Sequence, residues 1–164
     1  MAFTPANRAR AGEIVARYPV AKSAILPLLH LAQDQDGWVS PDAMEEIGRI
    51  LELTSAQVLG VCSFYSMFKR EPVGQLVVSV CTNVSCLVNG GPDLLDHLQR
   101  RYAADSDVTV EEVECIAACD LAPVLQVNYE FHGPVTGPDA EQVVDEYKAG
   151  KRVARTISGT RVKS

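Results

Sequence analysis

The chain has 164 residues, of which 47% are hydrophobic and 22% are charged, with a formal net charge of −6. This composition is typical of a soluble globular protein, and the length suits one domain, or a small domain with a helical extension. No apolar run approaches the ~20 residues that a transmembrane helix needs, so we expect no membrane insertion.

The charge is divided unevenly along the chain. Residues 151–164 contain five basic residues and no acid, which leaves 10 basic and 21 acidic residues in residues 1–150. Such an acidic body argues against nucleic-acid binding, which depends on neutralising phosphates. We predict a flexible basic tail over residues 151–164, or alternatively a tail that docks on an acidic face of a partner. The first 17 residues lack an apolar signal-peptide region, so we expect a cytoplasmic protein with reduced thiols.

Residues 1–71 carry helical periodicity, with apolar residues recurring three and four positions apart. We predict helices over residues 7–18 and 21–33, a third from Ser40-Pro41 through Leu51, and a fourth from Thr54 to Phe68. Ser40-Pro41 is an N-cap followed by proline, and Thr54 begins a capping box. Pro27 is expected near the first turn of its helix, or at a kink. We interpret residues 1–71 as an N-terminal helical extension.

After Gly74 the pattern changes to alternating strands and helices. We predict strands over residues 75–81, 108–115 and 123–128, a short edge strand near residues 135–136, a helix around Leu94 and Leu98, and a closing helix over residues 138–148. The order indicates an α/β domain over residues 72–150.

Four cysteines form two close pairs in this second part of the chain. Cys81 and Cys86 are separated by four residues, and Cys115 and Cys119 by three, with 28 residues between the pairs. Cys81 and Cys115 end predicted strands. If those strands are neighbours in the sheet, both loops emerge at one edge and the sulfurs converge.

Three interpretations of the four thiols are open on spacing alone. Thiolates hold [2Fe–2S] clusters, and they also hold structural zinc in tetrahedral sites. A dithiol redox pair is the third, although its usual C-x-x-C motif is absent. The apolar loops around the cysteines favour the cluster, because an apolar shell limits solvent access.

Several further motifs show a resemblance to a known family. They are Val80-Cys81-Thr82 with Cys86, Cys115 and Cys119 with Ala122-Pro123-Val124 and Val127-Asn128, and, in the helical half, residues 24–29, Asp36-Gly37-Trp38-Val39, Gly60-Val61 and Ser63-Phe64-Tyr65. Together they resemble the NuoE-type thioredoxin-like [2Fe–2S] subunit of NADH:quinone oxidoreductase (respiratory complex I). The resemblance covers roughly residues 10–150.

The resemblance implies a thioredoxin-like domain in which Cys81, Cys86, Cys115 and Cys119 ligate one [2Fe–2S] cluster. It also implies an electron-transfer subunit. Because the segment Asn89-Gly90-Gly91-Pro92 matches neither G-x-G-x-x-G nor the lysine-containing phosphate loop, we expect no NADH or catalytic site in the chain itself. Its cluster would exchange single electrons with FMN in a partner flavoprotein (NuoF type) that also binds NADH. The complex would lie on the cytoplasmic side of the inner membrane. Alternatives are the equivalent subunit of an NAD-linked hydrogenase or formate dehydrogenase, and a zinc-stabilised interaction module.

The sequence departs from the family pattern at three places. Ala117 stands where the family often has glycine, which requires a backbone conformation that alanine tolerates or some strain. The connection between Cys86 and Cys115 is short, and Leu87 replaces a histidine seen in some relatives.

The remaining cysteine, the histidines and the aromatic residues receive plainer interpretations. We expect Cys62 to be a buried apolar residue rather than a ligand. The aromatic run Phe64, Tyr65, Met67 and Phe68 is assigned first to the core and second to a partner interface, and Trp38 to a core or domain contact. His30, His97 and His132 lie at no ligand spacing from a cysteine.

Overall fold

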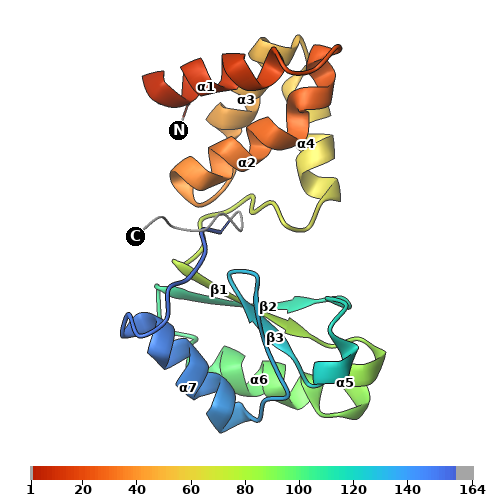
Figure 1. Cartoon of the computed structure of the whole chain (residues 1–164), viewed down its shortest axis with the longest axis vertical. Helices are drawn as coiled ribbons and strands as arrows, with labels where there is room; N and C mark the ends of the chain where they lie inside the picture. Colours follow the sequence, from red (N-terminus) through yellow and green to blue (C-terminus); the bar gives the residue numbers. More distant parts are fainter. Residues whose placement is uncertain (1, 158–164) are drawn as a thin grey trace. The chain divides into compact units, whose positions relative to one another are not determined.

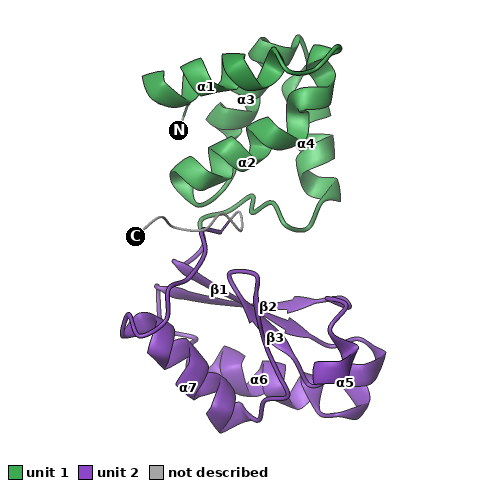
Figure 2. Cartoon of the chain, in the orientation of Figure 1, with its two compact units in different colours: residues 1–72 green, residues 73–164 purple. Residues whose placement is uncertain are grey.

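The computed structural model describes residues 2–157, and the chain divides between Pro72 and Val73 into two compact units (Figures 1 and 2). Unit 1 is helical, and unit 2 contains the sheet. Each unit has its own hydrophobic core. None of the helices among residues 2–157 has both the length and the apolar character needed to cross a membrane.

Unit 1 consists of four α-helices and one 3-10 turn. These are α1 (Pro5–Val15), η1 (Ala21–Ala24), α2 (Ile25–Asp36), α3 (Pro41–Leu51) and α4 (Ser55–Phe64). The predicted caps are present: the Ser40 side chain accepts from the Ala43 amide, and Thr54 forms a capping box with Gln57. Gly37 ends α2 with φ +78°, a conformation that glycine adopts at little steric cost. Pro27 is the third residue of α2, within its first turn.

Helix α4 is shorter than the sequence predicts. It ends at Phe64, because Tyr65 is extended with φ −94° and ψ 106°. The buried side chain of Gln33 holds the following segment: it donates to the Met67 carbonyl at 3.0 Å and accepts from the Lys69 amide at 2.6 Å. Phe68 enters the core from outside the helix, at 4% exposure. A contact with a residue more than 30 positions away in sequence therefore overrides the helical pattern.

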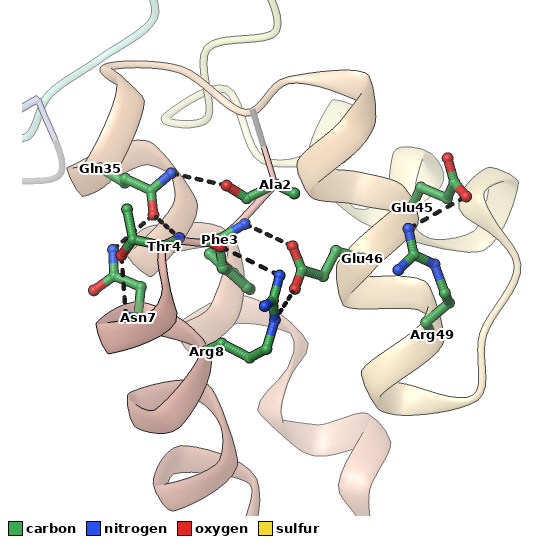
Figure 3. A network of polar contacts seen from close by, with 9 residues as sticks. All are labelled: Ala2, Phe3, Thr4, Asn7, Arg8, Gln35, Glu45, Glu46 and Arg49. Carbon is green, nitrogen blue, oxygen red and sulfur yellow. Dashed lines mark hydrogen bonds and ion pairs between the residues drawn. The ribbon is translucent and has the colours of Figure 1, made fainter.

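A buried carboxylate ties the N-terminus of unit 1 to α3 (Figure 3). Glu46, 3% exposed, accepts hydrogen bonds from the Phe3 amide and from Arg8 Nε, both at 2.6 Å. Burial alone raises the pKa of Glu46, but the bonds from Arg8 and Phe3 outweigh it, so the net shift is downward. The carboxylate therefore remains charged inside the unit, with its partners in place.

Unit 2 is built on a four-stranded sheet in the order β2-β1-β3-β4. The strands are β1 (Leu76–Cys81), β2 (Val108–Val113), β3 (Leu125–Val127) and β4 (Glu130–His132); β1 and β2 are parallel, and the other two pairings are antiparallel. Helices α6 (Gly91–Arg101) and α7 (Gly137–Lys148) lie on the same side of the sheet (Figure 1). The core of unit 2 lies between the sheet and these two helices, and its fully buried residues include Val78, Val80, Leu98 and Val144.

The predicted edge strand near residues 135–136 is wrong. The edge strand is β4, which follows β3 through Asn128 and Tyr129, at φ +45° and +70°. Two successive positive φ values are typical of tight hairpin turns, which usually carry glycine there, so this turn has little local signal in the sequence. Val135 instead donates its amide to the Pro123 carbonyl at 3.1 Å, and Thr136 caps α7.

The first part of the predicted basic tail contacts unit 2. Arg152 pairs with Glu146, and Arg155 pairs with Glu130. Asn128 Nδ2 donates to the Arg155 carbonyl at 2.8 Å. The remaining part of that predicted tail, residues 158–164, lies outside the described residues.

Candidate metal centre

The two cysteine pairs follow neighbouring parallel strands. Cys81 is the last residue of β1 and is in register with Val113, the last residue of β2. Beyond that pair, the Thr82 amide donates to the Val113 carbonyl at 3.2 Å. Parallel neighbours end at the same edge of a sheet, so both ligand loops leave together. The condition for convergence of the four sulfurs is therefore met.

Cys86 lies in a short helix, although the sequence predicts a loop there. This helix, α5 (Val84–Val88), is capped by Asn83, whose side chain accepts from the Val84 amide at 2.8 Å. Cys81 is 3% and Cys86 1% exposed. Burial raises the pKa of Cys86, and the neighbouring thiols of Cys81 and Cys119 add to that effect. The thiol of Cys86 is therefore affected by a residue of each cysteine pair.

Gly91 lets the start of α6 pack against both residues of the first pair. A Cβ at this position would lie 2.7 Å from the Cys81 carbonyl oxygen and 2.9 Å from that of Cys86. Contacts this short with backbone atoms cannot be relieved by a side-chain rotation. The absence of a side chain at Gly91 therefore permits α6 to pack closely against the first pair.

The second pair lies on a tight turn at the surface. Cys115 and Cys119 are exposed, and their sulfurs are 3.6 Å apart. The Ala117 amide donates to Cys115 Sγ at 3.4 Å, and Ala117 has φ +60°. The left-handed conformation expected at a family glycine is thus adopted by alanine. Strand β2 ends at Val113, two residues before the predicted end at Cys115.

Contacts between the loops bring the two pairs together. Cys115 raises the pKa of Cys119, while a hydrogen bond from Ser85 in α5 lowers it. The buried residues Cys81, Cys86 and Val124 form one small apolar cluster against which the second loop packs. Its partly buried members are Ile116, Ala118, Leu121 and Ala122.

The donor set fits a two-iron cluster. In the described part of the chain, no three His, Cys, Asp or Glu side chains are grouped so as to hold a metal ion. An all-cysteine [2Fe–2S] cluster needs only two protein ligands for each iron, because sulfide completes the coordination. Two thiol pairs on adjacent loops that pack around one apolar cluster match that requirement. All five cysteines are free thiols.

The other candidate residues lie elsewhere. Cys62 is fully buried in the core of unit 1, and burial raises the pKa of its thiol. The three histidines contact Phe68 (His30), Glu141 (His97) and Tyr147 (His132). The aromatic run divides, since Phe68 is in the core but Phe64 is 80% exposed. Trp38 is half-buried.

The expected apolar shell around the cysteines is incomplete, because part of the first ligand loop is exposed to solvent. Helix α5 exposes three apolar side chains beside the cysteines: Val84, Leu87 and Val88 are 71%, 56% and 77% exposed. The asparagine at residue 83 is a helix-capping residue and could have indicated a helix here. A helix of five residues is too short to show hydrophobic periodicity, however, so this helix was not predicted. Exposed apolar residues grouped in this way are typical of interaction surfaces.

A family model and individual relatives of this chain indicate the same protein family. The family model for the thioredoxin-like [2Fe–2S] ferredoxin matches residues 11–148. The E-type subunit of NADH-quinone oxidoreductase from Mycobacterium tuberculosis is 41% identical over 153 residues, which cover 89% of this chain and 61% of that protein. A second E-type subunit of NADH-quinone oxidoreductase, from Rhizobium meliloti, is 34% identical over 145 residues, covering 84% and 86%.

The chain thus spans 61% of the length of the mycobacterial relative. Among solved structures, a chain of an NAD+-reducing [NiFe]-hydrogenase superposes with a TM-score of 0.66 at 20% identity, covering 78% of this chain and 23% of that one. That likeness shows a shared fold. The predicted α/β fold class and family resemblance are confirmed: the chain belongs to the thioredoxin-like [2Fe–2S] ferredoxin family.

Proposed function

We propose that this member of the thioredoxin-like [2Fe–2S] ferredoxin family is an electron-transfer subunit of an NADH dehydrogenase. Its ligands to one [2Fe–2S] cluster are Cys81, Cys86, Cys115 and Cys119. One observation carries the proposal: two cysteine pairs follow neighbouring parallel strands, and the loops that hold them pack around one small apolar cluster that includes Cys81 and Cys86.

The two cysteine pairs differ in exposure, and each would contribute differently to binding a [2Fe–2S] cluster. Cys81 and Cys86 are buried and fixed by the sheet and by Gly91, so they provide a rigid, dry side. Cys115 and Cys119 are exposed and provide the side that faces outward. When bound, a [2Fe–2S] cluster accepts and donates single electrons. Electron exchange with another protein requires a short path from the surface, which the exposed pair supplies.

The partner that fits this surface is a flavoprotein that holds FMN and NADH, of the NuoF type. The chain has no glycine-rich phosphate motif, so hydride chemistry on NADH belongs to the partner. Val84, Leu87 and Val88 form an exposed apolar surface beside the exposed cysteines. Burying that surface against the partner would place the cluster close to the flavin. Assembly of such a complex on the cytoplasmic side of the inner membrane is part of the same proposal.

Metal analysis of the protein purified without oxygen tests the cluster. We expect about two iron and two sulfide per chain, with a visible spectrum that bleaches on reduction. Cys115→Ser should lose the cluster, whereas Cys62→Ser, the matched control from unit 1, should keep it. A colourless protein with one zinc per chain would instead establish the zinc-stabilised module.

Co-purification tests the partner. With the full chain as bait in its native host, we expect an FMN-containing protein and further subunits of an NADH–quinone oxidoreductase. Recovery of hydrogenase or formate dehydrogenase subunits would reassign the complex and leave the cluster unaffected. The Cys62→Ser protein serves again as the control, since it should recover the same partners as the wild type.

A further inference from the structure

We propose that Thr82, Asn83, Glu112 and Glu114 position the two cysteine pairs by linking one ligand loop to the other. This inter-loop clamp rests on the proposed function, because it matters only if the four cysteines hold one group. Each of its residues lies within three positions of a cysteine along the chain.

Two hydrogen bonds form the clamp. Thr82 Oγ1 donates to Glu112 Oε1 at 2.7 Å, and Asn83 Nδ2 donates to Glu114 Oε2 at 2.8 Å. Thr82 directly follows Cys81, and Glu114 directly precedes Cys115. Hydrogen bonds to ionised acceptors are stronger and shorter than neutral ones. The residue directly before Cys115 is thus bonded to the loop that follows Cys81.

The register of the sheet explains why these side chains meet. The β1–β2 ladder ends with the pair Cys81 and Val113, and one further backbone bond joins Thr82 to Val113. Past that point no backbone pairing joins Asn83 to Glu114 among the hydrogen bonds of the described chain. The side-chain bonds therefore continue the connection where the ladder stops.

Asn83 has two roles: it links the first ligand loop to the second, and it caps the helix that carries Cys86. Its Nδ2 is bound to Glu114, while its Oδ1 accepts from the Val84 amide and caps the helix that carries Cys86. The orientation of α5 is thereby tied to the residue next to Cys115. A ligand set distributed over two loops needs such a tie, because orienting contacts around a metal commonly change its affinity by about 10–100-fold.

The four residues of the clamp lie at the surface and are not part of the hydrophobic core of unit 2. Glu112 and Glu114 are exposed, and Thr82 and Asn83 are half-buried. Surface hydrogen bonds contribute little to overall stability, and the sheet core lies elsewhere, around Val78 and Val80. Removing the clamp should consequently alter the site without unfolding unit 2.

The test compares cluster retention in matched variants of the full chain. Glu112→Ala/Glu114→Ala removes both acceptors, whereas Glu112→Gln/Glu114→Gln removes both charges but keeps an oxygen that accepts. Asp96→Ala/Asp107→Ala removes two exposed acids of the same unit; Asp107 precedes β2, at the end opposite the cysteines. The readouts are the half-life of visible absorption under an iron chelator, the width of the electron paramagnetic resonance lines of the reduced protein, and thermal unfolding of the cluster-free protein.

We expect the double alanine variant to lose its cluster about tenfold faster than the wild type and to show broadened resonance lines, with unfolding unchanged. The double glutamine variant and the aspartate control should stay within about twofold of the wild type. Wild-type retention in the double alanine variant, or equal loss in the glutamine variant, would overturn the clamp.

A double-mutant cycle with Asn83→Ala and Glu114→Ala isolates the bond between the loops. Asn83→Ala also weakens the cap of α5, but that effect cancels in the cycle. We expect the combined loss to be several-fold smaller than the product of the single losses. Independent effects would refute the proposal. A wild-type chain that binds no cluster at all would refute the proposed function instead, so the two failures are distinguishable.

Discussion

Replacing Ala117 by glycine should stabilise unit 2. Ala117 has φ +60°, where an L-residue with a Cβ is disfavoured by about 1–2 kcal/mol. Glycine removes that strain but gives the unfolded chain more freedom, which offsets about 0.4–1 kcal/mol. We therefore expect a net gain of about 0.5–1 kcal/mol. The bond from the residue 117 amide to Cys115 Sγ uses a backbone donor, so the substitution retains it.

Thermal unfolding of the cluster-free protein measures this effect. For a unit of this size, the expected gain raises the midpoint by about 3–6 °C. Ala118→Gly is the matched control: Ala118 has a negative φ of −118° and packs against the apolar cluster, so glycine should lower the midpoint. If Ala117→Gly lowered the midpoint as much as Ala118→Gly, strain at Ala117 would be refuted.

Three further predictions concern other parts of the molecule. Because the pKa of Glu46 is lowered in the folded state, its contribution to stability is complete above its ordinary pKa of 4.5 and is lost as the pH falls through the folded value; Glu46→Gln should flatten this acid dependence in chemical unfolding. Gly91→Ala should reduce iron and sulfide content more than Gly60→Ala, because a Cβ at residue 91 meets two ligand carbonyls and a Cβ at Gly60 meets nothing within 4 Å. Leu87→Asp/Val88→Asp should weaken recovery of the flavoprotein partner while leaving cluster content unchanged; undiminished recovery would exclude this apolar surface as the contact.

Sequence predicted best those elements whose signals are local. Helix caps at Ser40 and Thr54 depend on residues within one turn, and both are present in the structure. The end of α4 depends on Gln33, and the hairpin at Asn128 depends on pairing between β3 and β4. Neither signal lies within a short window of sequence, so periodicity extended the helix and misplaced the edge strand.

The same division applies to the site. Cysteine spacing and strand ends predicted that the two thiol pairs would leave one edge of the sheet if their strands were neighbours, and β1 and β2 do pair in parallel. The contacts of Thr82 with Glu112 and of Asn83 with Glu114 depend on the register of that pairing. A shift of one residue would separate these partners, and the predicted strands carried no assignment of register. The positions of the four cysteines beside the sheet could therefore be predicted, but the contacts between their loops could not.

The two halves of the site are unequal in ways that fit electron exchange with a partner. The first pair is buried, capped and packed against Gly91, whereas the second is exposed on a turn that includes a strained alanine. A site built only like the second half would be loose, and one built only like the first would be shielded from a partner's electrons. The clamp joins them, so that the rigidity of the sheet reaches the exposed cysteines through two side-chain bonds. Rigid support with an exposed ligand pair meets both requirements at once.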